Sequence, residues 1–445
     1  MHTAEHAAEQ EKEQIWRRTE WFRQDRFGMF IHWGLYAIPA RGEWVQSAER
    51  ISAEAYREYF DAFNPEHFEP ADWARAAKQA GMKYAVLTAK HHDGFCLFDS
   101  KLTDYTSVHS PCGRDMVREF VEAFRAEGLR IGLYYSLLDW HHPDYPAYGD
   151  AHHPQRDDPA YSRDPQAFDR YVEYMHGQIR ELLTNYGTID IMWFDFSYGE
   201  MTADKWKAAE LMRMVRELAP DLIVDNRLDA SGEHGGSIMT GYPLSYSGDF
   251  ASPEQIIPPE GVIDALGFPI PWEACITLNN NWGYHAGDQE YKSATLVIRK
   301  LVECVSKGGN LLLNVGPNAR GEIPEASLRI LDEIGEWMRL NGDSIYGCGR
   351  AGLAKPEWGR YTAGNGNVLY AHLMEQAIGP VNLCGLAGKV RRPVLLRDGA
   401  EVKLVDSWNT KSYPEDAFIN FGAVDWFTYP LADPRDTVIK LEIVD

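Results

Sequence analysis

The chain has 445 residues, of which 44% are hydrophobic, 25% charged and 12% aromatic, and its formal net charge at pH 7 is −22. A strongly negative protein is repelled by phosphate backbones and anionic lipid, so the charge argues against nucleic acid and membranes as partners. The composition is that of a globular protein, and the length predicts two or three domains.

The six cysteines are scattered along the chain and form neither a CxxC pair nor a metal-finger spacing. This pattern predicts free thiols in a reducing compartment. Residues 1–14 are polar and acidic and lack the apolar core of a signal peptide. No apolar run approaches the roughly 18 residues that a membrane span needs. The sequence therefore predicts a soluble, cytoplasmic protein, and it is compatible with a homo-oligomer.

Strand-like and helix-like segments alternate from residue 27 to about residue 340. The predicted strands are 27–34, 84–90, 130–137, 189–195, 222–227, 272–278 and 310–315. The predicted helices are 53–63, 70–80, 114–127, 165–185, 203–218, 291–307 and 326–340, and the stretch 229–270 is mostly loop. Such alternation indicates a parallel sheet, and this number of units fits a (β/α)8 barrel better than an open sheet.

The pattern changes near residue 345. Short strand-like runs at 368–373, 394–396, 402–405 and 438–444 are separated by clusters of Gly, Pro and Asp. This pattern is typical of an all-β sandwich. The sequence thus predicts a catalytic barrel over residues 1–345 and a C-terminal β-sandwich over residues 346–445.

Polar and ionisable residues follow the ends of successive predicted strands. They are His32, His91, His92, Tyr135, Asp195 and Arg227. The carboxyl ends of barrel strands form one face, so we expect these side chains to converge on one pocket. Asp195 is the most informative because it ends an otherwise apolar strand, where a carboxylate is costly unless it is used.

Two kinds of chemistry fit this cluster. Three histidines with carboxylates can bind a metal ion, but His91 and His92 are adjacent and would point to opposite faces of a regular strand. The spacing that aims two imidazoles at one ion is missing, which disfavours a metal site. The alternative is a sugar pocket. Glycoside hydrolysis requires two carboxyl groups beside the scissile bond, so a second one is expected downstream of Asp195.

A series of short motifs resembles glycoside hydrolase family 29, the retaining α-L-fucosidases. The motifs, in chain order, are FGMFIHWG at 27–34, GEW at 42–44, KHHDGF at 90–95, YYS at 134–136, WFD at 193–195, DNR at 225–227, WEAC at 272–275 and NWGY at 281–284. The resemblance covers essentially the whole barrel. It implies an exo-acting enzyme that removes terminal α-L-fucose from a glycan, needs no cofactor, and carries a β-sandwich after its barrel.

The resemblance also implies roles for individual residues. Asp195 matches the family's nucleophile, and Glu254 best matches the acid/base by its spacing after the strand that ends at Arg227. Glu273, on the next predicted strand, is the alternative acid/base and otherwise a residue that braces Arg227. The remaining positions that match sugar-binding or pocket-lining residues are His32, Glu43, Trp44, His91, His92, Tyr135, Trp193, Arg227 and Trp282.

The residues after the nucleophile depart from the family pattern. Many relatives have a small residue there, whereas this chain has Phe196, Ser197 and Tyr198. A bulky residue would narrow the leaving-group side or change the sugar that fits. A related exoglycosidase with galactose-type specificity therefore stays open as one alternative. A second, from a different class, is a non-catalytic sugar-binding protein on the same scaffold. The pairing of Asp195 with a downstream carboxylate argues against the second.

Overall fold

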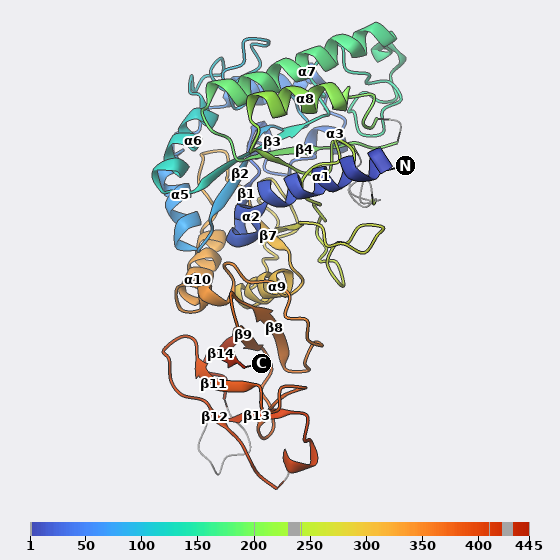
Figure 1. The fold of residues 1–445 in the computed structure, drawn as a ribbon. Helices are drawn as coiled ribbons and strands as arrows, with labels where there is room; N and C mark the ends of the chain where they lie inside the picture. The colour runs from blue at the N-terminus through green and yellow to red at the C-terminus, as the bar shows by residue number, and fades with distance from the viewer. Residues whose placement is uncertain are drawn as a thin grey trace.

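The computed structural model describes residues 2–199, 201–229, 241, 243–408, 410–420 and 430–444, with side chains from residue 9 onward. It has two parts, a curved parallel sheet surrounded by helices and, beyond one end of this layer, a set of antiparallel strands (Figure 1). The N-terminal helices lie against the first part, and the C-terminal strands lie in the second.

Seven parallel strands form the first sheet, in the order β5-β4-β3-β2-β1-β7-β6. They are β1 (Phe27–Ile31), β2 (Tyr84–Lys90), β3 (Arg130–Ser136), β4 (Ile191–Asp195), β5 (Ile223–Val224), β6 (Glu273–Thr277) and β7 (Asn310–Val315). All seven are buried at nearly every position, because one face meets the helices and the other lines the barrel interior.

An irregular segment between Phe250 and Glu254 joins the two outer strands of this sheet. The parallel bridges are Asp225 with Phe250, Ala251 with Trp272, and Glu254 with Cys275. The segment therefore occupies the place of an eighth strand, and the predicted (β/α)8 barrel is confirmed. The sequence predicted this stretch as loop because its pairing leaves no regular apolar pattern. Residues 230–240 and 242 of the predicted loop lie outside the described residues.

Helices cover the outer face of the barrel (Figure 1). The helices that follow the first barrel strand are α3 (Val45–Ala48), α4 (Ala53–Ala62), α5 (Pro70–Gln79), α6 (Met116–Ala126), α7 (Pro165–Asn185), α8 (Ala208–Leu218), α9 (Ala294–Ser306) and α10 (Glu325–Asn341), with short 3₁₀ turns at Leu35–Ala37, Pro159–Tyr161, Gly342–Ser344 and, in the C-terminal part, Thr410–Ser412. None of the helices in the described part of the chain is long and apolar enough to cross a membrane.

Two N-terminal helices, α1 (His2–Arg18) and α2 (Glu20–Asp25), precede the barrel. Phe22 of α2 packs against Tyr84 and Phe250, with ring centroids 5.7 and 4.8 Å away. Tyr84 is the first residue of β2, so α2 closes the end of the barrel where the strands begin. The opposite end, where the strands finish, stays open for the site.

Side-chain caps fix several helix starts close to the predicted positions. Asp115, Asp164 and Ser293 each accept a hydrogen bond from the backbone N–H three residues later, as N-cap residues do. The α8 helix begins at Ala208, five residues after the predicted start. The residue before it, Lys207, has a left-handed backbone with φ 49°, which a continuing helix cannot contain.

The C-terminal part contains two antiparallel sheets, with the strand orders β11-β14-β9-β8 and β10-β13-β12. The strands are β8 (Gly359–Ala363), β9 (Val368–Leu373), β10 (Val381–Leu383), β11 (Val390–Leu395), β12 (Lys403–Leu404), β13 (Ala417–Asn420) and β14 (Thr437–Ile443). Both sheets contribute to one apolar cluster, which includes Leu373, Ile419 and Leu441. The predicted sandwich is confirmed, although β8, β10 and β13 are too short or too polar to be recognised from sequence.

The sandwich is attached to the barrel through α9. Arg299 of this helix donates hydrogen bonds to the carbonyls of Arg435 (2.9 Å) and Met374 (2.7 Å). The apolar cluster of the barrel continues into this region through Ile345 and Cys348. The boundary between residues 345 and 346 stays a prediction.

The contact between α5 and α10 gives a test of helix packing. A Cβ added at Gly335 would lie 2.2 Å from the carbonyl oxygen of Gln79, which is backbone and cannot turn away. We expect Gly335→Ala to lower the free energy of unfolding by about 1–3 kcal/mol, measured by urea denaturation. Gly177→Ala in α7 is the control, since its Cβ meets only the flexible, half-exposed side chain of Leu102.

In the control, alanine should be neutral or should stabilise the helix by up to about 1 kcal/mol. A Gly335→Ala protein that is as stable as the wild type would contradict the packing described for α5 and α10.

Candidate active site

A pocket opens at the carboxyl ends of the barrel strands. Its lining residues are Phe30, His32, Glu43, Trp44, His91, His92, Tyr134, Trp193, Asp195, Phe196, Arg227, Glu254, Cys275 and Trp282. The hollow spans about 370 Å³, which includes space open to solvent. Its lining combines aromatic rings with carboxylates, imidazoles and one guanidinium, and this mixture suits a small polar ring.

Arg227 lies between the two carboxylates of the pocket. Its Nη1 is 2.8 Å from Asp195 Oδ1 and 2.8 Å from Glu254 Oε2. Because both oxygens are bound to the same nitrogen, they are at most twice 2.8 Å, or 5.6 Å, apart. The side chain of Asp195 is 13% exposed and that of Glu254 is 43% exposed. One carboxylate therefore lies at the floor and the other faces solvent.

The guanidinium of Arg227 is held on all sides. Its Nε donates to Ser252 Oγ (3.0 Å) and its Nη2 donates to the Ser252 carbonyl (3.0 Å). Its carbon lies 4.5 Å from the centre of the Trp193 ring, a cation–π distance. Burial alone would lower the pKa of Arg227, but Asp195 and Glu254 raise it well above its ordinary value. Arg227 is therefore a fixed positive charge.

The three histidines of the pocket are neutral. Burial lowers the pKa of His32 to about 3 and lowers the pKa values of His91 and His92 well below their ordinary range. A neutral imidazole carries one donor and one acceptor nitrogen. His91 Nδ1 is buried and has no hydrogen-bond partner among the described residues.

The orientation of His32 follows from that of Asn314. The Asn314 Nδ2 donates to the carbonyl of Trp282 (2.7 Å), so its Oδ1 must be the atom that faces His32. His32 Nδ1 donates to this oxygen at 2.6 Å, which leaves His32 Nε2 as an acceptor. Such an acceptor suits a hydroxyl donor.

A break in strand register lets both adjacent histidines reach the pocket. Thr88 pairs with Tyr134, but Lys90 pairs with the next residue, Tyr135, so β2 contains a bulge at this point. The strand ends at Lys90, directly before His91. The rings of His91 and His92 lie side by side, with centroids 4.0 Å apart. The alternation expected of a regular strand therefore does not apply to them.

Tyr135, which the sequence predicted as a sugar-binding residue, does not line the pocket. Its hydroxyl donates to Gln178 of α7 (2.7 Å), on the outer face of the sheet. The pocket contains Tyr134 instead, and the Tyr134 hydroxyl donates to Asp195 Oδ2 at 2.7 Å. The prediction was wrong by one residue, which on a strand means the opposite face. The apolar Ile131 and Leu133 share the outward face with Tyr135 and could have indicated this.

Glu273 does not line the pocket either. It is the first residue of β6, so it lies in the barrel interior toward the end opposite the site, while Cys275 on the same strand lines the pocket. The hydroxyl of Tyr84 donates a hydrogen bond to Glu273 Oε2. Burial raises the pKa of Glu273 to about 8. The alternative prediction of Glu273 as the acid/base, or as a pocket residue, therefore fails on position.

Glu43 and Trp282 form another side of the pocket. Glu43 is buried, and its Oε2 accepts the backbone N–H of Gly283 at 2.8 Å. The Trp282 ring lies 5.0 Å from His32 and 5.9 Å from Phe30. The loop after β6 therefore places an apolar surface beside the Glu43 carboxylate, which comes from the loop after β1.

Phe196 packs beside Trp44 with its backbone in a strained conformation. Its backbone φ is 81°, in the left-handed region that bulky residues rarely adopt. Residues with such strained backbone angles cluster at active sites. Its ring lies 5.4 Å from Trp44 and 4.9 Å from both His92 and His152. The bulky residue noted in the sequence is thus part of the pocket wall.

The described residues contain no group of three or more His, Cys, Asp or Glu side chains that is arranged to hold a metal ion. The histidines instead face aromatic rings and one another. Tyr134, for example, stacks on His91 with centroids 5.6 Å apart.

Comparison with known proteins gives consistent matches. The family model described as Alpha-L-fucosidase matches residues 1–343. Plasma alpha-L-fucosidase of Homo sapiens is 30% identical over 352 residues, which cover 73% of this chain and 68% of that protein. Alpha-L-fucosidase isoenzyme 1 from Paenibacillus thiaminolyticus is 60% identical, with a TM-score of 0.93 over 97% of this chain and all of the other.

A GH29 alpha-L-fucosidase from Bacteroides thetaiotaomicron, solved as a trapped covalent intermediate with 2-fluoro-fucosyl fluoride, is also similar. It is 31% identical, with a TM-score of 0.82, and the match covers 96% of each chain.

The raised pKa of Glu273 predicts how stability depends on pH. The folded pKa of about 8 exceeds the ordinary 4.5, so the free energy of unfolding of the wild type should fall as pH rises from about 4.5 to about 8. Glu273→Gln mimics the neutral acid and should not show this fall. We expect the variant to gain up to a few kcal/mol on the wild type between pH 5 and pH 8.5, measured by urea denaturation.

Glu303→Gln is the control. Its partners Lys307 and Lys300 outweigh its burial and lower the pKa of Glu303 to about 2, so it is ionised throughout this pH range. Its stability difference from the wild type should stay constant. Parallel pH curves for Glu273→Gln and the wild type would contradict a neutral Glu273.

Proposed function

The chain belongs to the alpha-L-fucosidase family and is a retaining, exo-acting fucosidase, and we propose that Asp195 is its nucleophile and Glu254 its general acid and base. The spacing of the two carboxylates supports these roles. The two oxygens that Arg227 Nη1 binds, one from each carboxylate, lie at most 5.6 Å apart. Such closeness fits a retaining enzyme, whose carboxyl groups are about 5–5.5 Å apart, better than an inverting enzyme, whose carboxyl groups are roughly 6.5–9.5 Å apart to admit a water molecule.

The proposed reaction has two displacements. In the first, Asp195 attacks the anomeric carbon while the protonated Glu254 gives its proton to the glycosidic oxygen, so the bond to the leaving group breaks. In the second, Glu254 takes a proton from water, the water oxygen attacks the same carbon, and the bond to Asp195 breaks. Hydrogen bonds from Tyr134 and Arg227 orient Asp195 for the attack. The exposure of Glu254 suits a group that meets both the leaving group and water.

The other pocket residues would bind the sugar. We assign the hydroxyl contacts to the neutral His32, His91 and His92 and to Glu43, which together offer donors and acceptors. The apolar surfaces of Trp44, Trp193 and Trp282 would contact the ring and the methyl group at C5, where galactose carries a hydroxymethyl group. A galactose-type specificity and a non-catalytic role are not favoured by the family membership.

We further propose that the protein works in the cytoplasm. All six cysteines are unpaired, and four of them are buried. This supports a compartment that keeps thiols reduced. Fractionation of the source cells followed by immunoblotting should find the protein in the cytoplasmic fraction. Its recovery mainly from the medium would contradict this assignment.

Azide rescue tests the two catalytic roles. Asp195→Gly and Glu254→Ala should each hydrolyse an aryl α-L-fucoside more slowly, the latter by about 10²–10⁴-fold when the leaving group needs protonation. Azide should restore turnover of both variants. We expect the β-azide from Asp195→Gly, because azide then replaces the nucleophile, and the α-azide from Glu254→Ala, because azide then attacks the glycosyl-enzyme. NMR of the products distinguishes the two anomers.

Glu273→Gln is the matched control, since it removes a carboxylate of the barrel interior. Its activity should stay within tenfold of the wild type and should not respond to azide. A loss rescued by azide at Glu273 with no effect at Glu254 would refute the assignment of Glu254. Failure of the wild type to hydrolyse the fucoside would refute the proposed function itself.

A further inference from the structure

We propose that Lys90 and Asp139 form a positioning pair that fixes one wall of the fucose pocket, namely Trp44 and His92 with Trp140 behind them. The proposal rests on the proposed function, because the wall is a sugar-binding surface only if that function is right. Neither Lys90 nor Asp139 lines the pocket. The pair would therefore act through the residues that do.

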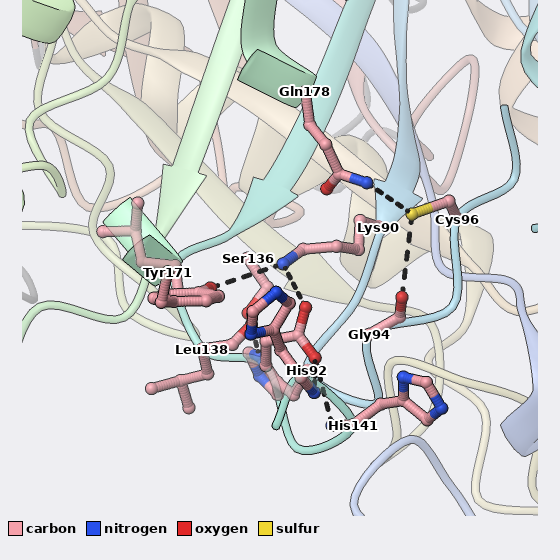
Figure 2. A network of polar contacts seen from close by, with 12 residues as sticks. Lys90, His92, Gly94, Cys96, Ser136, Leu138, His141, Tyr171 and Gln178 are labelled. Carbon is pink, nitrogen blue, oxygen red and sulfur yellow. Dashed lines mark hydrogen bonds and ion pairs between the residues drawn. The ribbon is translucent and has the colours of Figure 1, made fainter. Parts of the chain in front are cut away.

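The first step is the position of Lys90. The bulge in β2 pairs Lys90 with Tyr135, so it projects to the outer face of the sheet. Its side chain is completely buried there. Its Nζ lies 2.9 Å from Asp139 Oδ2 and 3.5 Å from the Tyr171 hydroxyl, which Figure 2 shows beside it. The Tyr135 ring centre lies 4.5 Å from the same nitrogen.

The second step is the other oxygen of Asp139. Its Oδ1 accepts the backbone N–H groups of His141 (3.0 Å) and His142 (2.8 Å), which turns the chain directly after Trp140. The Trp140 N–H donates to the carbonyl of His92 at 2.8 Å. One carboxylate therefore ties the end of β2 to the loop after β3.

The two segments approach so closely that no side chain fits between them. A Cβ at Gly94 would lie 2.3 Å from Asp139 Oδ1, and Gly94 also has a positive φ of 77°. The loop that follows His92 thus packs directly on the carboxylate. A shift of Asp139 would have to move this loop as well.

The third step is the contact with the pocket. The Trp140 ring lies 5.4 Å from the His92 ring and 5.4 Å from the Trp44 ring. His92 Nδ1 also lies 2.7 Å from the Oγ of Ser136, which is the last residue of β3 (Figure 2). The position of the wall therefore depends on the loop that Asp139 holds.

Because Lys90 and Asp139 form a buried ion pair, their main role is to position the pocket wall rather than to stabilise the fold. Burial would raise the pKa of Asp139, but Lys90 and the neighbouring histidines hold it below its ordinary value, so the pair is ionic. Removing two charges from water is costly, and an apolar pair of the same size is often as stable or more stable. Among the roles of buried polar and ionic groups, fixing the register of packed elements is the best attested.

The test compares Lys90→Met, Asp139→Asn and the double variant Lys90→Met/Asp139→Asn. In the folded enzyme we expect each to raise KM for an aryl α-L-fucoside at least tenfold, with kcat within threefold of the wild type. The double variant leaves no unpaired buried charge, so it keeps the test valid if either single variant fails to fold. Titration with L-fucose by calorimetry should show the same loss of affinity.

Arg18→Met is the matched control. Arg18 forms another buried ion pair, with Nη2 2.7 Å from Asp249 Oδ1, outside the pocket. The Arg18→Met variant should have a lower melting temperature than the wild type and the same KM. The proposal is overturned if the folded Lys90 and Asp139 variants keep KM within twofold of the wild type, or if kcat falls while KM and L-fucose affinity do not change. Wild-type turnover of the fucoside tests the proposed function separately.

Discussion

The guanidinium of Arg227 is the constraint on which the site depends. Two carboxylates in a largely buried pocket repel each other, and Arg227 lets Asp195 and Glu254 stay close by binding both through one nitrogen. The same side chain binds Ser252 of the irregular closing strand. Because Ser252 and Glu254 share that strand, one arginine links closure of the barrel to the placement of the second carboxylate.

The sequence predicted which segments converge but not always which side chain of a pair faces the pocket. Tyr134 and Tyr135 are neighbouring tyrosines of one motif. Which of them faces the pocket depends on how the side chains alternate along β3. The bulge in β2 is a similar case, because alternation counted along the sequence gives the wrong face after Ala89. The apolar Ile131 and Leu133 indicate the phase of β3, whereas the register shift in β2 has no signal in residue type.

The closing strand was missed for a different reason. Its bridges to β5 and β6 are non-local, and the Ser-Pro-Glu run that carries Glu254 has no strand pattern. The barrel could be predicted because strand-like and helix-like segments alternate regularly, and the sandwich because short strand-like runs follow one another without a long helix. Glu254 was favoured over Glu273 from family spacing, and the position of Glu273 at the start of β6 gives that preference a structural basis.

The central claim is that Asp195, one of the two carboxylates bound to Arg227, forms the covalent bond to the sugar. The most direct measurement is to incubate the protein with 2-deoxy-2-fluoro-fucosyl fluoride, digest it, and locate the added sugar by peptide mass spectrometry. The account predicts a single fluorofucosyl group on Asp195, and no label in Asp195→Gly. Label on Glu254, or steady hydrolysis of the reagent by Asp195→Gly at the wild-type rate, would contradict it.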